Sequence, residues 1–312
     1  MIAFLFPGQG AQYPGMGAAL AARDAGAAAL FARASVVLGF DLLALCGEGS
    51  EEELRATENT QPAILVTSLA CAAALDARGV RPGVAAGLSL GEYAALVAAG
   101  ALGFEDAVAL VRRRGLFMQE ATAGRETAMA ALFGLDAAAV ERVLAAHRHL
   151  GVVEAANFNG AGQIVIGGDA AAVKAAVAGS KRAGARRAVL LAVSAPFHTS
   201  LMAPAAARLA PLLAEVELRD AAFPVVANVT AEPAQRAATV RDLLLRQVVS
   251  PVRWEASVRR MAALGASAFV EVGPGTTLSG LVRKILPWAP VLHVEDGRSL
   301  DDTVEALGAG VR

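Results

Sequence analysis

The sequence has little cysteine, only Cys46 and Cys71 among 312 residues. Two widely separated cysteines cannot form a disulfide framework or a cysteine-based metal cluster. Histidine is also scarce, with four residues, and no spacing of histidine, aspartate and glutamate matches a metal site. We therefore expect no metal, and a chain that folds in a reducing cytoplasm.

Long apolar runs are missing too, although 55% of the residues are hydrophobic and the mean hydropathy is +0.49. The most apolar stretches, 62–75 and 94–102, are shorter than the ~18–20 residues that a membrane helix needs. The opening segment MIAFLFPGQG has no basic residue and reaches Pro7 after a short apolar run, which indicates a buried strand and not a signal peptide. We expect a cytoplasmic protein that does not enter a membrane, with a monomer as the default state.

The chain has almost no net charge, with 28 basic and 29 acidic residues, so no overall field attracts nucleic acid. The glycine-rich segment 8–13 places Tyr13 where a dinucleotide-binding loop needs its third glycine, and no P-loop motif is present. Nucleotide cofactors are therefore not expected. One basic cluster has two interpretations, a solvated helix face or a docking patch for an acidic partner: Lys181, Arg182, Arg186 and Arg187.

The order of secondary-structure patterns predicts an α/β fold with a parallel sheet. Helices are expected at 18–37, 61–78, 90–99, 104–121, 200–215, 240–248 and 251–264. Strands are expected at 2–6, 83–87, 223–227 and 268–272. We predict that 1–125 and 195–312 form one discontinuous domain.

Residues 126–194 have a different pattern, in which the order is β-α-β-β-α-β. The six elements are expected at 128–133, 137–147, 152–157, 163–166, 170–183 and 187–193. This order is typical of the ferredoxin-like unit, so we predict a small inserted domain of that type.

The segment Gly87-Leu88-Ser89-Leu90-Gly91 follows a predicted strand and precedes a predicted helix. A nucleophile elbow needs this context, and it needs small neighbours that allow a strained turn to expose the serine Oγ. Ser89 is therefore the candidate nucleophile, with an ordinary helix-capping serine as the alternative.

A serine needs a base to become nucleophilic, and His198 is the best candidate. It follows Pro196-Phe197 where the small domain returns to the large one, and active sites tend to lie at domain interfaces. The other three histidines occur in contexts that fit structural roles.

Arg114 projects from the centre of the apolar face of the helix at 104–118, whereas Arg112 and Arg113 point away from it. A guanidinium stays charged, so an inward arginine needs an anion. That anion is either a protein carboxylate in a structural ion pair or a carboxylate that a substrate brings.

Together these features resemble the malonyl-CoA:acyl-carrier-protein transacylase family, which includes trans-acting polyketide synthase acyltransferases. Seven motifs in order carry the resemblance: FPGQGAQ, GLSLGEY, RRRGLFMQEA, NFNGAGQIVIGG, VSAPFHTSLM, RQVVSPVRW and VEVGPG. The resemblance implies an α/β-hydrolase-like core with a ferredoxin-like insert. It also implies ping-pong transfer of a malonyl group from malonyl-CoA to the phosphopantetheine thiol of an acyl carrier protein.

Carried over by position, the family's site residues are Ser89 as nucleophile, His198 as base and Arg114 as the ligand of the malonyl carboxylate. The backbone N–H groups of Gln9 and Leu90 would form the oxyanion hole, and the backbone carbonyl of Gln247 would orient the histidine. In related polyketide acyltransferases, phenylalanine just before the histidine, which is Phe197 here, goes with malonyl, and serine goes with methylmalonyl. Leu88 is a departure, because the family usually has histidine there.

Three other hypotheses fit the sequence less well. An editing acyl hydrolase or thioesterase acting on carrier-protein thioesters would have no use for Arg114 as a carboxylate ligand. An ordinary esterase is disfavoured by the insert and by the lack of an acid shortly before His198. A non-catalytic docking subunit is disfavoured because all three central residues are present. The pathway that the malonyl group enters is not specified by the sequence.

Overall fold

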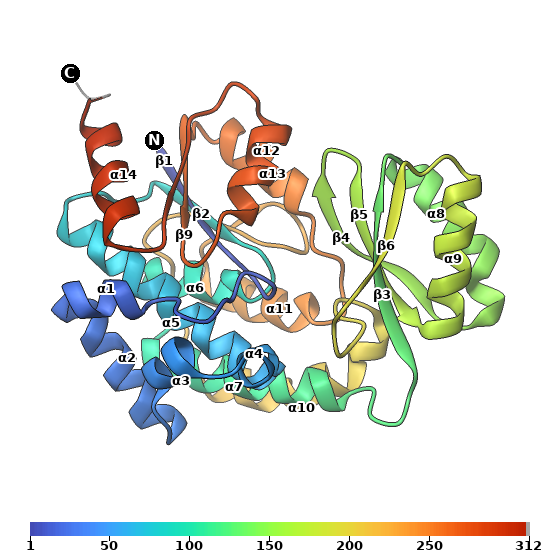
Figure 1. The fold of residues 1–312 in the computed structure, drawn as a ribbon, viewed down its shortest axis with the longest axis horizontal. Coiled ribbons are helices and arrows are strands. Elements are labelled where there is room, and N and C mark those ends of the chain that lie inside the picture. The colour runs from blue at the N-terminus through green and yellow to red at the C-terminus, as the bar shows by residue number, and fades with distance from the viewer. Residues whose placement is uncertain (310–312) are drawn as a thin grey trace.

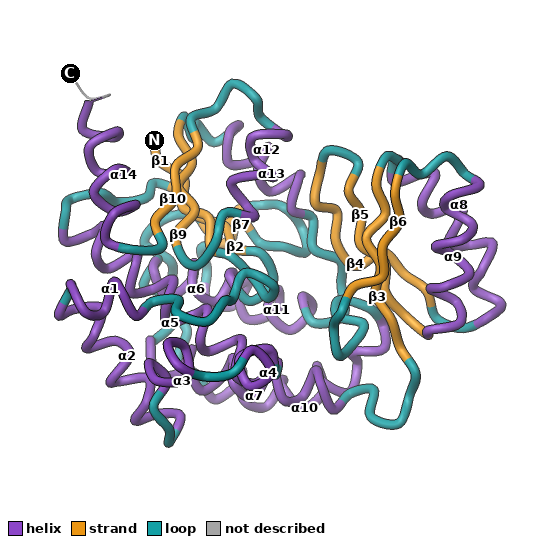
Figure 2. The backbone as a smooth tube through the Cα atoms, viewed as in Figure 1, coloured by secondary structure: helices purple, strands orange, loops and turns teal. Residues whose placement is uncertain are grey.

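A six-stranded sheet forms the centre of the larger part of the molecule in the computed structural model, which describes residues 1–309 (Figures 1 and 2). Its strands, in chain order, are β1 (Ile2–Phe6), β2 (Val84–Gly87), β7 (Val225–Val226), β8 (Pro233–Ala234), β9 (Ala268–Val272) and β10 (Val291–Val294). They lie in the order β10-β9-β1-β2-β7-β8, and all pairs are parallel except β7 with β8. The predicted α/β fold with a parallel sheet is confirmed.

Helices cover both faces of this sheet, and β1 shows how its side chains alternate between them. Phe4 and Phe6 join one apolar core, while Ala3 and Leu5 join a second core on the opposite face. The first core packs against α1 (Ala18–Arg23), α2 (Ala25–Leu38), α3 (Leu42–Glu48), α4 (Glu51–Arg55), α5 (Thr57–Ala77), α6 (Gly91–Ala98), α7 (Phe104–Glu120), α10 (Ala203–Glu215), α11 (Ala237–Gln247) and α14 (Gly297–Ala309). The second packs against α12 (Trp254–Ala263) and α13 (Thr277–Ile285).

A separate antiparallel sheet forms the smaller part, on the right in Figure 1. Its strands are β3 (Thr127–Phe133), β4 (Val153–Gly160), β5 (Gln163–Asp169) and β6 (Arg187–Leu191), in the order β4-β5-β3-β6. Helices α8 (Ala137–His147) and α9 (Ala170–Arg182) pack on its outer face and enclose a third core. The element order expected for 126–194 is confirmed.

The other face of the small sheet points towards the larger part. Alternate residues of β3 and β5, Met129, Ala131 and Val165, belong to the first core rather than to the third. The edge strand β4 also bonds to the larger part, because Phe158 N–H donates to Val252 O (2.8 Å) and Val252 N–H donates to Ala156 O (2.9 Å). These contacts hold the inner face of the small sheet above the ends of the parallel strands.

Several boundaries differ from the sequence prediction. The single helix expected at 18–37 is wrong, because Asp24 has extended backbone (φ −124°) and its carboxylate accepts the N–H of Ala27, starting a second helix. The strand expected at 223–227 is only two residues long, and the helix expected at 200–215 begins as a 3-10 turn, Ser200–Met202. Helices and strands of the larger part that were not predicted from the sequence are α3, α4, β8, α13, β10 and α14.

The helix α5 is longer than expected. It begins at Thr57 and spans 21 residues, and among residues 1–309 it is the single helix long and apolar enough by itself to cross a membrane. The expectation that no apolar run reaches this length is therefore wrong. In the structure 78% of its apolar window is buried inside the protein, as in the central helix of a globular core.

Candidate active site

Ser89 lies in a sharp turn between β2 and α6, with a positive φ of 54°. The turn is tight on both sides. A Cβ on Gly87 would lie 1.8 Å from the carbonyl carbon of Gly91, and a Cβ on Gly91 would lie 2.1 Å from the Phe6 oxygen. Only glycine fits at either position, so the geometry is that of a nucleophile elbow and not of an ordinary helix cap.

Asn228, in the loop after β7, holds this turn with its side chain. Its Oδ1 accepts the N–H of Ser89 (2.7 Å), and its Nδ2 donates to the carbonyl of Gly87 (2.6 Å). No motif or periodicity in the sequence singled out this residue. Its position could have indicated a role, because it follows directly after the strand that neighbours β2. Functional side chains gather at this carboxyl edge of a parallel sheet.

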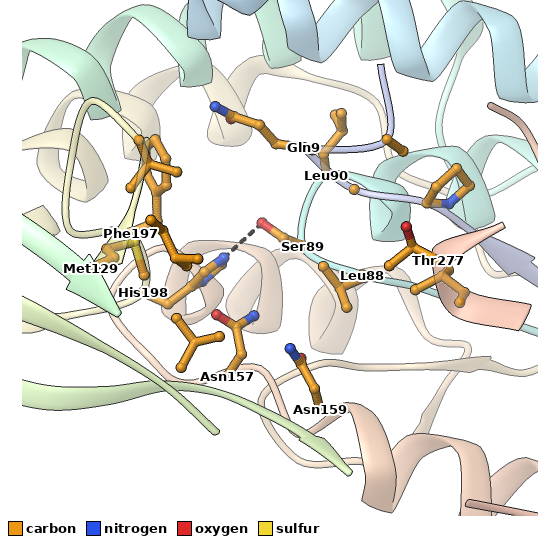
Figure 3. A pocket seen from close by; sticks show the side chains of 18 of the residues that line it. Gln9, Leu88, Ser89, Leu90, Met129, Asn157, Asn159, Phe197, His198 and Thr277 are labelled. Atoms are coloured by element: carbon orange, nitrogen blue, oxygen red, sulfur yellow. Dashed lines mark hydrogen bonds between the residues drawn. The ribbon is translucent and has the colours of Figure 1, made fainter. Parts of the chain in front are cut away.

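His198 meets Ser89 across the boundary between the two sheets (Figure 3). Its Nε2 lies 2.7 Å from Ser89 Oγ, and its Nδ1 lies 2.9 Å from the carbonyl oxygen of Gln247. Because that oxygen can only accept, Nδ1 carries the proton and Nε2 is the acceptor for the serine hydroxyl. Burial, and after it the positive charge of Arg114, lower the pKa of His198 to about 4. The imidazole is therefore neutral at pH 7 and able to accept a proton.

Arg114 is buried, with 2% of its surface exposed, and it points into the same space. Its Nη2 donates to Ser89 Oγ and to Gln247 Oε1, and its Nη1 donates to Gln61 Oε1, each at 2.9 Å. All of these acceptors are neutral. Among residues 1–309 no carboxylate lies within 4.0 Å of the guanidinium, so the alternative of a structural ion pair is wrong. A buried cation of this kind is ready to bind an anionic group of a ligand.

Gln247 ends α11 and contacts each of these groups. Besides its backbone bond to His198, its side-chain Nε2 donates to Ser89 O (3.0 Å) and to Glu92 Oε2 (2.7 Å). Its backbone role was expected from the family resemblance, whereas its side-chain contacts were not.

Glu92 is a buried carboxyl group that the sequence analysis did not single out, although it belongs to the quoted motif GLSLGEY. Burial raises its pKa to about 7, while hydrogen bonds from Gln247 and Asn228 and the charge of Arg114 act in the opposite direction. Its position one residue after Gly91, on the first turn of α6, could have indicated a role near Ser89.

The loop after β1 lies against the elbow. A Cβ on Gly8 would lie 2.4 Å from the Leu88 oxygen, so glycine permits this close approach. The approach brings Gln9 and Leu90 to the wall of the same cavity. Within the described part of the chain, neither of their backbone N–H groups donates to a protein acceptor.

A cavity of about 270 Å³ opens between the two sheets at Ser89. The residues that line it from the larger part include Gln9, Leu88, Arg114 and Phe197, and those from the antiparallel sheet include Met129 and Val165. Figure 3 shows Asn157 and Asn159 pointing into it from β4. A mostly apolar pocket with a few polar groups around one serine suits a short acyl chain. No group of three or more metal-ligating side chains occurs in 1–309.

The chain is similar to known proteins along nearly its whole length. A family model described as acyl transferase domain matches residues 3–291. The malonyl CoA-acyl carrier protein transacylase of Bacillus subtilis (strain 168) is 45% identical over 307 residues, covering 98% of this chain and 97% of that protein. The corresponding transacylase of Escherichia coli (strain K12) is 46% identical over 285 residues, covering 91% and 92%.

A solved structure gives the same result. A malonyl-transacylase in complex with its type II PKS acyl-carrier protein superposes with a TM-score of 0.95 at 42% identity, covering 98% of this chain and 99% of that one.

Proposed function

The chain belongs to the acyl transferase domain family, and from this premise we propose that it transfers a malonyl group from malonyl-CoA to the phosphopantetheine thiol of an acyl carrier protein. The transfer is ping-pong and passes through a malonyl ester of Ser89. The proposal rests on the similarity to malonyl transacylases and on the chemistry of the cavity.

The observation that carries the choice of malonyl is the environment of Arg114. Its guanidinium is buried beside Ser89 Oγ and bonds only neutral oxygens. A malonyl group on Ser89 carries a carboxylate at its far end, and this carboxylate supplies the missing anion by a bidentate contact. An unsubstituted acyl chain leaves the charge unpaired.

The acylation half-reaction follows from the contacts of Ser89 and His198. His198 Nε2 takes the hydroxyl proton as Ser89 Oγ attacks the thioester carbonyl of malonyl-CoA. The backbone N–H groups of Gln9 and Leu90 bind the oxyanion that forms, because they have no other acceptor in 1–309. The carbon–sulfur bond then breaks, and the proton on His198 passes to the sulfur of coenzyme A.

Transfer reverses these steps with a different thiol. His198 takes the proton of the phosphopantetheine thiol, whose sulfur attacks the ester carbonyl, and the proton returns to Ser89 Oγ as the ester bond breaks. The Gln247 carbonyl keeps the proton of His198 on Nδ1 throughout. A carbonyl dipole replaces the carboxylate of a serine hydrolase triad here.

We also propose finer features that accompany this function. The core is α/β-hydrolase-like and spans 1–125 and 195–312, and the insert 126–194 is ferredoxin-like, which its strand order supports. Phe197 narrows the acyl pocket against an α-methyl group. The enzyme works in the cytoplasm as a monomer without a cofactor or metal. The basic cluster of Lys181, Arg182, Arg186 and Arg187 stays a prediction for carrier docking.

The experiment that tests this function separates transfer from hydrolysis. Purified protein is incubated with malonyl-CoA, with and without a carrier protein that bears phosphopantetheine, and the products are resolved by mass. Rapid appearance of malonyl-carrier with slow release of free malonate supports the transferase. Equal release of malonate in both reactions would instead support the editing hydrolase.

A further inference from the structure

We propose that Glu92 is a positioning residue for malonyl selection: its Oε2 fixes the side-chain amide of Gln247, which in turn holds Arg114 facing Ser89. This inference rests on the proposed function, because it concerns how the ligand of the malonyl carboxylate is held. Glu92 touches no reacting atom and acts through Gln247.

The amide of Gln247 has only one favourable orientation. Its Nε2 faces two acceptors, Ser89 O at 3.0 Å and Glu92 Oε2 at 2.7 Å, and its Oε1 faces a donor, Arg114 Nη2 at 2.9 Å. The flipped amide would oppose oxygen to oxygen and N–H to N–H in a buried site, where unpaired polar groups are costly.

Arg114 depends on this orientation because of what else holds it. Within the described chain its guanidinium bonds two amide oxygens, on Gln61 and Gln247, besides Ser89 Oγ. Nη2 donates hydrogen bonds to both Ser89 and Gln247. The Gln247 oxygen therefore determines the position of this nitrogen relative to an acyl group on Ser89. Loss of this acceptor leaves the guanidinium anchored to Gln61 alone when the serine is acylated.

The anchor of Gln247 is itself rigid. The same Oε2 of Glu92 accepts the backbone N–H of Asn228 (3.1 Å), and the Asn228 side chain spans the elbow from Gly87 to Ser89. One carboxyl oxygen therefore ties α6, α11 and the loop after β7 together beneath the nucleophile. Both donors meet Oε2, so a proton on the other oxygen breaks neither bond, and the raised pKa of Glu92, about 7, is compatible with the role.

Two variants at this position separate the acceptor from the bulk of the side chain. Glu92→Gln keeps an oxygen for both donors, whereas Glu92→Leu keeps a similar volume and removes the acceptor. The readout is the ratio of the acylation rates of Ser89 with malonyl-CoA and with acetyl-CoA. This ratio does not depend on the fraction of correctly folded protein, so a merely structural role of Glu92 leaves it unchanged.

We expect Glu92→Leu to lower the malonyl-to-acetyl ratio by roughly tenfold or more, and Glu92→Gln to stay within about threefold of the wild type. In an Arg114→Ala background, Glu92→Leu should cause no further change in the ratio, because Arg114 carries the effect. Glu271→Gln, the same change at a buried carboxyl group that caps α13, should leave the ratio unaltered.

A wild-type ratio in Glu92→Leu, or an equal fall with both substrates, would overturn the assignment. Failure of the proposed function is recognised separately, because the wild-type protein would then form no malonyl adduct.

Discussion

Ser89 and His198 meet at 2.7 Å, and both reach this contact with backbone in the left-handed region, at φ 54° and φ 62°. Only two other non-glycine residues in 1–309 have positive φ, Ala161 and Ala231. Such conformations cost free energy and persist where the surroundings impose them. Here the elbow glycines and Asn228 hold the serine, and the Gln247 carbonyl holds the histidine, so the pair is set before substrate arrives.

The low pKa of His198 predicts the pH dependence of acylation. With a folded pKa of about 4, the base stays neutral, so the rate of malonylation should be level with respect to this group from about pH 6 to 8 and fall only as the pH approaches 4. Rapid-quench measurement of Ser89 malonylation across this range checks it. A fall in the malonylation rate as the pH drops through 6.5, the ordinary pKa of histidine, would contradict the buried environment assigned to His198.

The same shift predicts a stability effect. Because the folded pKa lies below the unfolded value of 6.5, the unfolded chain binds more protons between the two, and the free energy of unfolding should fall as the pH drops from 6.5 towards 4. Denaturant unfolding of wild type and His198→Asn should show a steeper loss in the wild type, because the carboxyl groups that also titrate towards the lower end of this range are common to both proteins. Parallel curves for the two proteins would mean that His198 is not buried as a neutral group.

Arg114→Ala should slow malonyl transfer by roughly 10- to 100-fold, with a much smaller effect on any residual acetyl transfer. The reason is that only malonyl offers a carboxylate to the buried guanidinium. Arg113→Ala, on the exposed side of the same helix, is the matched control and should behave as wild type. If acetyl and malonyl transfer fall equally in Arg114→Ala, the arginine is structural.

Phe197→Ser should widen the acyl pocket. Its ring is buried at the cavity wall beside His198, and removal of this volume should raise acceptance of methylmalonyl relative to malonyl by roughly tenfold, since a single methyl group is worth only that order of discrimination. Competition between malonyl-CoA and methylmalonyl-CoA, read by the mass of the adduct on Ser89, measures it. An unchanged product ratio would show that another wall of the cavity sets the choice.

Gly87→Ala should damage the elbow. The added Cβ would lie 1.8 Å from Gly91, so we expect a loss of about 3 kcal/mol in the free energy of unfolding, and loss of acylation. Gly280→Ala is the matched control, because nothing lies within 4 Å of its Cβ in the helix α13, and alanine there should stabilise by up to about 1 kcal/mol. Urea unfolding of both variants tests the contrast, and a Gly87→Ala protein of wild-type stability would contradict it.

The sequence predicted the reactive residues of the site better than the hydrogen bonds that connect them. Ser89 stands in a local pattern of strand, turn and helix, and Arg114 stands out on a helical stripe, so periodicity finds both. Gln247 Nε2 bonds Glu92 across 155 positions of the chain, and that contact exists only once α11 packs beside α6. No local pattern predicts such a pairing.

The fold likewise has features that the sequence predicts and features that it does not. The order of elements in 126–194 followed from hydrophobic periodicity. The break at Asp24 did not, because the alanine-rich residues around it favour helix on both sides, and the break depends on the extended backbone of Asp24, whose carboxylate caps the second helix.

The central claim is that Ser89 carries the malonyl group, and the intact mass of the protein after brief exposure to malonyl-CoA tests it most directly. We predict a gain of one malonyl group on wild-type protein, mapped to Ser89 by peptide mass, and no gain on Ser89→Ala. The adduct should disappear when a carrier protein bearing a free phosphopantetheine thiol is added. An unmodified wild-type mass, or an adduct that survives in Ser89→Ala, would contradict the account.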